Sequence, residues 1–193
     1  MLKAKQPQAE KPLRIIGGRW RGRKLNFPAI EGLRPTGDRI RETLFNWLAP
    51  HLPGARCLDL FAGSGALGLE ALSRGAGEVV LLEKSAPACE QLRSNLALLQ
   101  AEGATLINED SLQWLSRADP GPGFDVVFLD PPFEHNFWQA SIEALHARGW
   151  LAPGAAIYVE SGQDTPYEVP ESWTLHRDKS AGQVCYRLYW LDE

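Results

Sequence analysis

From Arg56 onward, short apolar runs alternate with longer amphipathic stretches. A short apolar run is typical of a strand buried on both faces, and apolar residues at helical spacing indicate a helix. Their alternation predicts an α/β fold in which helices cover a parallel sheet. The predicted strands are 56–61, 78–83, 105–108, 124–130 and 155–160, and the predicted helices are 66–74, 86–99, 112–117 and 138–148.

Both ends of the chain depart from this alternation. Residues 14–25 hold two short strand-like runs around glycines, with basic and aromatic residues interleaved, and this predicts a hairpin. Residues 38–48 have apolar positions at helical spacing, and we expect Thr36 or Asp38 to cap that helix. The strand-like runs within residues 173–191 predict a closing antiparallel hairpin.

The length of 193 residues fits one compact domain with a short extension. We divide the chain into a tail at 1–12, expected to be disordered, an N-terminal hairpin and helix at 13–53, and a sheet-containing domain at 54–193. The chain has no run of 18 apolar residues and no apolar N-terminal stretch, so we expect a cytosolic protein without membrane contact. Its three cysteines form no C-x-x-C pair, which argues against a zinc knuckle or a disulfide framework.

The charge is distributed unevenly. Residues 1–41 hold 11 of the 20 Lys and Arg residues but only three of the 24 Asp and Glu residues. The net charge is therefore +8 in this segment and -12 in the rest of the chain. Clustered basic residues repel one another unless a polyanion compensates them, so a basic arm on an acidic body indicates a polyanionic partner such as nucleic acid. A solubilising tail is the alternative.

A glycine-rich turn joins the first predicted strand to the following helix. Gly63, Ser64 and Gly65 let a ligand approach the backbone, and the start of the helix offers unpaired N–H groups. Glu83 lies 20 residues beyond Gly63, at the end of the next strand, where a carboxylate can accept hydrogen bonds from ribose hydroxyls. These features suit NAD as well as S-adenosylmethionine.

Other residues favour S-adenosylmethionine over NAD. Asp59 lies late in the first strand, where a dinucleotide fold normally has an apolar residue, and it could receive the ammonium group of the ligand. No recognisable hydride-transfer residues follow. Asp110 and Ser111, after the third strand, either cap the next helix or contact the adenine of the cofactor, and the two roles can coexist.

The tetrapeptide Asp130-Pro131-Pro132-Phe133 ends the fourth predicted strand. Its prolines fix φ and remove N–H donors, so the loop presents hydrogen-bond acceptors, which suit an amino group. We expect the Asp130 side chain and the Pro131 carbonyl to accept the hydrogens of a target amine, with Phe133 stacked on the base. Neither a metal nor a covalent intermediate is needed. A structural proline turn after a strand is the alternative.

Six segments of the chain are similar to a known family: residues 14–18, 33–36, 38–46, 61–71, 130–133 and 181–184. On these segments the sequence resembles the RsmD family, bacterial methyltransferases that modify the N2 amine of one guanine in small-subunit (16S) ribosomal RNA. The resemblance implies S-adenosylmethionine as cofactor and an assembled or nearly assembled small subunit as substrate. It also implies a Rossmann-like class I methyltransferase fold, with a seven-stranded, mostly parallel sheet and an N-terminal hairpin.

The resemblance also assigns roles to residues. It places Gly63, Gly65, Glu83 and Asp110 around the cofactor, Asp130 and Phe133 at the target base, and Thr36 and Arg39 near the mouth of the site. We expect Thr36 to contact the cofactor and the protein to act as a monomer. The residues expected to bind RNA, which the charge asymmetry supports independently, are Arg19, Trp20, Arg21, Arg23, Lys24, Arg34 and Arg39.

Three other functions stay open from the residues alone. The tetrapeptide recognises an amine without specifying the base, so an adenine methyltransferase is the nearest alternative. An NAD-dependent oxidoreductase would bind a nicotinamide cofactor and transfer no methyl group. A non-catalytic RNA-binding factor with the same fold would not require Asp130 for its cellular function.

Overall fold

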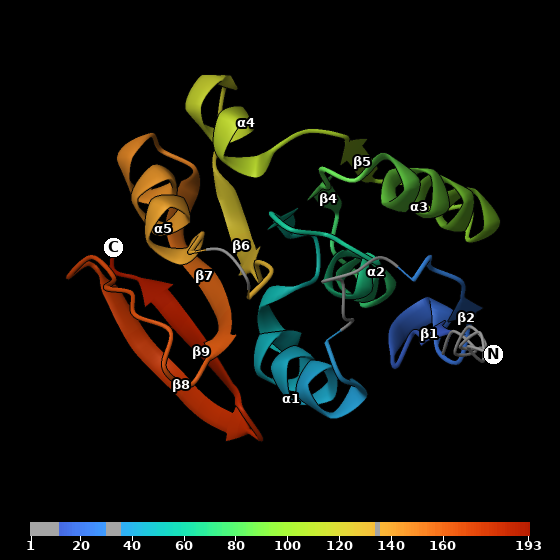
Figure 1. Cartoon of the computed structure of the whole chain (residues 1–193), viewed down its shortest axis with the longest axis horizontal. Helices are drawn as coiled ribbons and strands as arrows, with labels where there is room; N and C mark the ends of the chain where they lie inside the picture. The colour runs from blue at the N-terminus through green and yellow to red at the C-terminus, as the bar shows by residue number, and fades with distance from the viewer. Residues whose placement is uncertain (1–11, 30–35, 134–135) are drawn as a thin grey trace, which may run out of the picture.

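The computed structural model describes residues 12–29, 36–133 and 136–193, and it has the expected α/β fold (Figure 1). Seven strands form one sheet in the order β5-β4-β3-β6-β7-β9-β8. The pairs among β5, β4, β3, β6 and β7 are parallel, whereas β9 runs antiparallel to both of its neighbours. The strands are β3 (Arg56–Asp59), β4 (Glu78–Leu82), β5 (Ala104–Ile107), β6 (Phe124–Leu129), β7 (Leu151–Gly162), β8 (Trp173–Ala181) and β9 (Val184–Leu191).

Helices cover both faces of the sheet, so each face has its own core. Side chains of α1, α2 and α3 pack with one face, and those of α4 and α5 pack with the other. The central strands are buried on both sides, which explains their continuous apolar sequence. The helices are α1 (Asp38–Leu48), α2 (Ala66–Ser73), α3 (Ala86–Leu98), α4 (Ser111–Arg117) and α5 (Trp138–Ala147), with short 3-10 helices at Gly18–Trp20 (η1) and Ala49–His51 (η2).

The predicted N-terminal hairpin is confirmed. Strands β1 (Leu13–Arg14) and β2 (Lys24–Leu25) pair antiparallel and form a separate two-stranded sheet. Their apolar side chains belong to the same core as α1, α2 and one face of the large sheet. The backbone of Gly18 passes so close to α2 that a Cβ there would lie 1.9 Å from the Ser73 carbonyl oxygen. The hairpin is therefore packed tightly on α2.

The expected cap of α1 is wrong. Gly37 occupies the N-cap position and makes no side-chain hydrogen bond, and Asp38 is the first helical residue. The Thr36 hydroxyl lies instead within hydrogen-bond distance of the carboxylates of Asp130 and Glu160, while Asp38 pairs with Arg41 one turn later. These long-range partners cannot be seen in the local sequence. Within the described residues, no helix combines the length and apolar character needed to span a membrane.

Candidate active site

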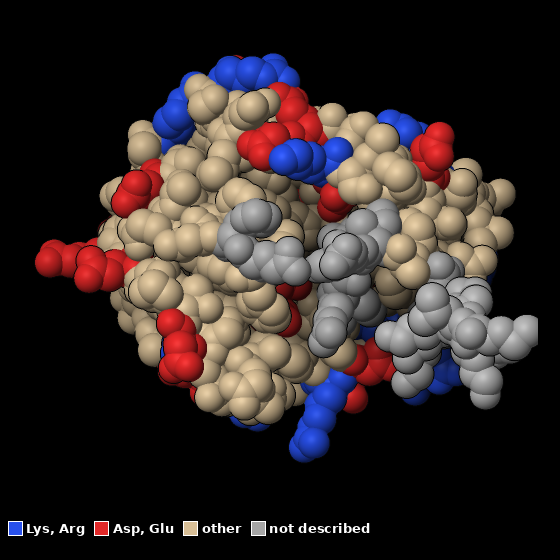
Figure 2. Space-filling view, in the orientation of Figure 1, with Lys and Arg blue, Asp and Glu red and all other residues tan. Residues whose placement is uncertain are grey.

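A cavity of about 660 Å³ lies at the carboxyl ends of the parallel strands. Strand order reverses between β3 and β6, and a crevice at that point is the usual ligand site of an open α/β sheet. In Figure 2, acidic side chains are visible near the centre of this face. The sequence-predicted residues that line the cavity are Thr36, Asp59, Gly63, Ser64, Glu83, Asp110, Ser111, Asp130, Pro131 and Phe133.

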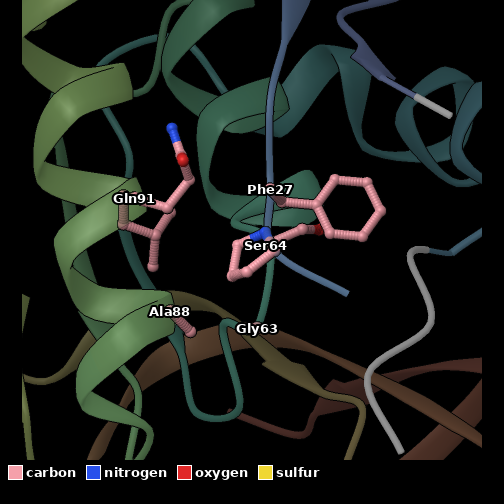
Figure 3. Close-up of a pocket in the computed structure, with 7 residues that line it drawn as sticks. Phe27, Gly63, Ser64, Ala88 and Gln91 are labelled. Atoms are coloured by element: carbon pink, nitrogen blue, oxygen red, sulfur yellow. The ribbon is translucent and has the colours of Figure 1, made fainter. Parts of the chain in front are cut away.

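The carboxylate of Glu83 fixes the backbone of the glycine turn by accepting a hydrogen bond from it. Gly63 has a φ of +55° and its N–H donates to Glu83 Oε2 at 2.7 Å, while Oε1 accepts from the N–H of Ser85. Phe27, which follows the N-terminal hairpin, lies beside Ser64 at the rim of this turn (Figure 3). The turn thus presents backbone and a fixed carboxylate to the same space, an arrangement that suits a ribose.

Asp59 and the residues after β5 complete the wall of the cavity. The Asp59 Oδ2 atom accepts from Gly68 N–H at 3.0 Å, which ties β3 to α2. Burial, with Glu83 adding negative charge nearby, raises the pKa of Asp59 to about 7 despite backbone hydrogen bonds that favour the charged form. Asp110 caps α4 through Gln113 N–H and also lines the cavity, and Ser111 donates to the Leu60 carbonyl. The expected double role of Asp110 is therefore geometrically available.

The carboxylates of Asp130 and Glu160, from neighbouring strands, both lie within hydrogen-bond distance of the Thr36 hydroxyl. Thr36 Oγ1 lies 2.9 Å from Asp130 Oδ2 and 3.2 Å from Glu160 Oε2. Tyr158 donates its hydroxyl to the same Glu160 oxygen at 2.7 Å. Thr36 and Glu160 are each 5% exposed, whereas Asp130 is more exposed and borders the cavity. Asp130 and Glu160 thus form one acid pair, which borders the cavity through both residues.

Burial is the main influence on both carboxyl groups. It raises the pKa of Asp130 well above its usual range, and the nearby negative charges of Glu160 and Asp59 add to the shift against the Thr36 hydrogen bond. Burial also raises the pKa of Glu160, although the hydroxyls of Tyr158 and Thr36 favour its charged form. Of the two, Glu160 is better supplied with hydrogen-bond donors.

The Asp130–Phe133 loop presents an aromatic ring at the mouth of the cavity. Phe133 is 55% exposed and lies nearly parallel to the buried ring of Trp138, with centroids 6.0 Å apart. Trp138 is fixed in turn, because its indole N–H donates to the Glu160 backbone carbonyl at 2.8 Å. A large exposed aromatic ring backed by a rigid one suits stacking on a flat ligand such as a base.

Comparison with known proteins identifies the family. A family model described as "Conserved hypothetical protein 95" matches residues 13–190. A relative from Haemophilus influenzae named "Ribosomal RNA small subunit methyltransferase D" is 51% identical over 191 residues, which cover 98% of this chain and 99% of the relative. The chain belongs to the RsmD family. A solved structure described as "Putative methyltransferase yhhF from Escherichia coli" is 49% identical and has a TM-score of 0.86, and the match covers 94% of this chain and 99% of that one.

A more distant structure supports the fold of this RsmD family member. An RNA methyltransferase from Salinibacter ruber in complex with S-adenosyl-L-homocysteine is 18% identical, with a TM-score of 0.63 over 83% of this chain and 95% of its own. At that identity the likeness concerns the fold alone. The fold of S-adenosylmethionine-dependent methyltransferases is thereby confirmed for this chain, together with the N-terminal hairpin.

Gly65 has a different position from the other residues assigned by resemblance to the RsmD family. It is absent from the lining of the cavity and serves as the N-cap of α2 with a φ of +81°. A Cβ at this position would lie 2.5 Å from Leu92 Cδ2. Its geometry therefore accounts for a glycine through backbone conformation and helix packing, and its contact with a cofactor stays a prediction.

Of the residues expected to bind RNA, Trp20 does not fit. It is 7% exposed, its N–H donates to Ser73 Oγ, and the Arg19 guanidinium lies over its ring at 4.2 Å. Trp20 is thus a core residue of this RsmD family member, and its apparent place in a basic and aromatic surface was misleading. Arg34 lies outside the described residues. The exposed members of the set are Arg19, Arg21, Arg23, Lys24 and Arg39.

Sequence reasoning missed Glu160, although a signal was present. Glu83, Asp130 and Glu160 all lie at or just beyond the carboxyl ends of parallel strands, so an inventory of acids at those ends would have included Glu160. It also missed Phe27 and Lys84, which line the cavity. Neither has a motif around it that would indicate a ligand.

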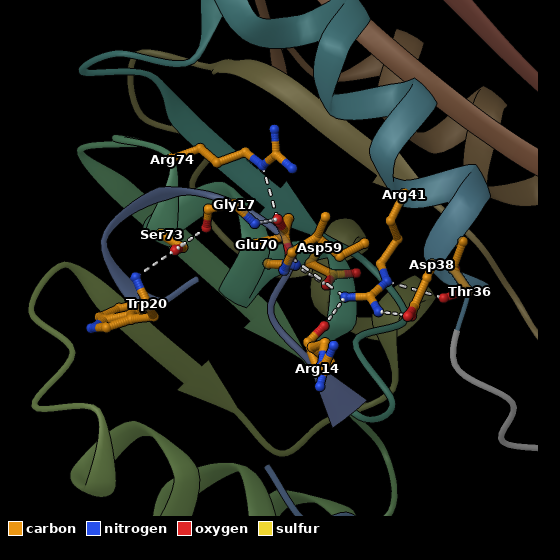
Figure 4. Close-up of polar contacts among 12 residues, drawn as sticks. Arg14, Gly17, Trp20, Thr36, Asp38, Arg41, Asp59, Glu70, Ser73 and Arg74 are labelled. Atoms are coloured by element: carbon orange, nitrogen blue, oxygen red, sulfur yellow. Dashed lines mark hydrogen bonds and ion pairs between the residues drawn. The ribbon is translucent and has the colours of Figure 1, made fainter. Parts of the chain in front are cut away.

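A buried charge network was missed as well (Figure 4). Glu70 is fully buried and accepts from the N–H groups of Ile16 and Gly17 at 3.0 and 2.8 Å. It also pairs with Arg41 and Arg74. Arg41 extends the network, because it donates to the carbonyls of Arg14 and Thr36. The hairpin, α2 and the residue that joins the two acids are thus connected.

Proposed function

We propose that this protein transfers a methyl group from S-adenosylmethionine to the exocyclic N2 amine of a guanine in small-subunit (16S) ribosomal RNA. The expected substrate is the assembled or nearly assembled small subunit. The observation that carries the proposal is the position of Asp130-Pro131-Pro132-Phe133, which shares one cavity with the glycine turn and Glu83. Membership of the RsmD family and the name of the Haemophilus influenzae relative support ribosomal RNA as the substrate.

The residues around the cavity fit S-adenosylmethionine. Its volume of about 660 Å³ lies in the usual range for small-molecule sites. All three of Glu83, Asp110 and Ser111 line the cavity; Glu83 would accept hydrogen bonds from the ribose, and Asp110 with Ser111 would contact the adenine. Asp59, Asp130 and Glu160 make the interior acidic, which favours a ligand that carries an ammonium and a sulfonium charge. The described chain thus offers partners for the ribose, the adenine and the two cationic groups of the cofactor.

The loop after β6 would orient the target amine. Asp130 Oδ1 and the Pro131 carbonyl would each accept one amine hydrogen, which turns the nitrogen lone pair into the cavity. When bound, S-adenosylmethionine would supply a methyl group whose C–S bond breaks, with its electron pair left on sulfur, as the new N–C bond forms. Asp130 would take the proton that the amine loses, and Phe133 would hold the base by stacking.

Methyl transfer to isolated subunits tests this proposal. Small subunits from cells that lack the enzyme are incubated with labelled S-adenosylmethionine and the purified protein, and the labelled nucleoside is identified after digestion. We expect N2-methylguanosine, with faster labelling of subunits than of free 16S RNA. Labelled N6-methyladenosine, or no labelled nucleoside, would contradict the proposal.

The basic hairpin is expected to contact RNA phosphates. Arg21, Arg23 and Lys24 are exposed on this hairpin. Their joint replacement by glutamine should weaken RNA binding about 10- to 100-fold at low salt, because each lost phosphate contact reduces counterion release. The slope of log K against log salt should become shallower by roughly 2 units. Filter binding across a salt series measures both quantities.

The control for this experiment lies on the far edge of the large sheet. Arg177 and Lys179 are exposed on β8, at the opposite end of the molecule from β1 and β2 (Figure 1). Their replacement by glutamine should change the slope of log K against log salt, per charge removed, much less than the replacement of the hairpin residues does. An equal change per charge in the two variants would show that the hairpin has no special role in RNA binding.

A further inference from the structure

The Thr36 hydroxyl lies between Asp130 and Glu160 but has only one hydrogen to donate. A threonine hydroxyl has one hydrogen, so Thr36 cannot donate to both carboxylates at once. If both were ionised, one of the two short contacts would bring together oxygens without a hydrogen between them. With one proton added, Glu160 can donate to Thr36 Oγ1 while Thr36 donates to Asp130, and both contacts become hydrogen bonds.

Among the described residues, the groups around Asp130 and Glu160 add negative charge and include no cation that bonds to either carboxylate. Within the described parts of the chain, no Lys or Arg side chain is hydrogen-bonded to either carboxylate, and Asp59 on β3 adds negative charge. Other charged groups that line the cavity are Glu83, Lys84 and Asp110, while Arg41 on α1 donates to the Thr36 carbonyl. Tyr158 faces the pair from β7, and burial, with the negative charges of Glu160 and Asp130, raises the pKa of its phenol. Two buried like charges in such a place repel strongly.

We propose that Asp130 and Glu160 act as one acid pair that holds a single proton when the cavity is empty, releases it when a cationic methyl donor binds, and regains one from the target amine. This inference rests on the proposed function. Glu160 is then a positioning residue, since it acts on the amine only through Thr36 and Asp130. Burial, which raises the pKa of both carboxyls, favours retention of the shared proton.

The charge balance explains why such a pair suits this reaction. Before transfer, one sulfonium charge faces two carboxylates, which leaves one net negative charge. As the N–C bond forms and the C–S bond breaks, sulfur becomes neutral and the amine proton passes to Asp130. Once the carboxyl group rotates so that its protonated oxygen faces Thr36, Asp130 can donate to Thr36 while Thr36 donates to Glu160, and the proton can settle on either acid. One net negative charge again remains, and no charge has to cross the cavity wall during the reaction.

Proton release on ligand binding tests the proposal without any turnover. Isothermal titration calorimetry in buffers of different ionisation enthalpy, at about pH 7.5, counts the protons released per ligand bound. We expect on the order of one proton for S-adenosylmethionine and for an analogue with a protonated amine in place of the methylsulfonium. The neutral thioether S-adenosylhomocysteine should release almost none. Equal release by all three ligands would overturn the proposal.

Two variants separate the pair from Asp59, the other carboxyl with a raised pKa. Glu160→Gln removes one carboxyl of the pair and the negative charge that it adds to the effect of burial on Asp130, so proton release should fall well below one proton while binding persists. Asp59→Asn should retain the release. The opposite pattern would assign the proton to Asp59 and overturn the proposal. Failure of the wild-type protein to bind S-adenosylmethionine at all would contradict the proposed function itself, and the inference with it.

A third variant guards against misfolding of Glu160→Gln. Tyr158→Phe keeps the buried ring but removes one hydroxyl that stabilises the charged form of Glu160. The pair should then hold its proton to a higher pH. Release on donor binding falls to half of its maximum at a certain pH on the alkaline side. This pH should rise by roughly half a unit to one unit. An unchanged or lower midpoint would contradict the proposal.

Discussion

Replacement of Asp130 by asparagine is expected to lower kcat for methyl transfer by about 10²- to 10⁴-fold. Asparagine has nearly the same shape and can still accept one hydrogen bond from the amine, but it cannot take the proton that the amine loses. The Kd for S-adenosylmethionine should change by less than about tenfold, because the glycine turn, Glu83 and Asp110 are unaltered. Single-turnover assays measure the rate, and calorimetry measures the affinity.

A matched control lies on the same strand. Asp125 is exposed at the other end of β6, where its carboxylate accepts from the Arg56 N–H. Asp125→Asn should leave both constants within about twofold of the wild-type values. If Asp130→Asn weakened donor binding as strongly as it slowed turnover, Asp130 would belong to cofactor binding and its assignment to the amine would be wrong.

Replacement of Glu70 by glutamine should cost about 3–5 kcal/mol of unfolding free energy. The buried carboxylate accepts from two backbone N–H groups of the hairpin and pairs with Arg41 and Arg74. A glutamine NH₂ group would face these donors, so at least one buried partner would lose its acceptor. Urea unfolding measures the loss, and limited proteolysis should show faster cleavage within residues 13–25.

Glu78 provides the comparison for Glu70. It pairs with Arg56 across two strands, but its side chain is 44% exposed. Water solvates the charges of such a pair, so Glu78→Gln should cost less than about 1 kcal/mol. Similar losses in the two variants would show that the Glu70 network contributes no more than an ordinary surface ion pair.

Much of the fold could be predicted because it depends on local pattern. The central parallel strands are buried on both faces and are therefore continuously apolar, so their positions were predicted to within a few residues. The glycine turn and the Asp130 loop follow strands directly, and the topology of an open sheet then brings strand ends together. These features place most of the predicted site residues in one cavity.

The errors share a different physical origin, since each depends on a partner far along the chain. Trp20 resembles an exposed member of a basic surface, but contact with α2 at Ser73 buries it. Thr36 is a residue type that often caps helices, but its hydroxyl contacts the carboxylates of Asp130 and Glu160, which lie 94 and 124 residues away in the sequence. Glu70 looks like an ordinary helical acid until the hairpin covers it. Tertiary contacts decide such cases, and local propensity cannot.

The attachment of the hairpin to α2 has a consequence for protein engineering. The first residues of α2 line the cavity, while Glu70 and Ser73 hold the backbone of the hairpin. Transplantation of residues 13–25 alone onto another enzyme of this fold would leave the graft without its acceptors. A functional chimera would also need Glu70, Ser73 and Arg41, and the graft would have to keep Gly18, whose backbone approaches α2 too closely for any side chain. The unit of exchange is therefore the hairpin together with α2 and Arg41 of α1.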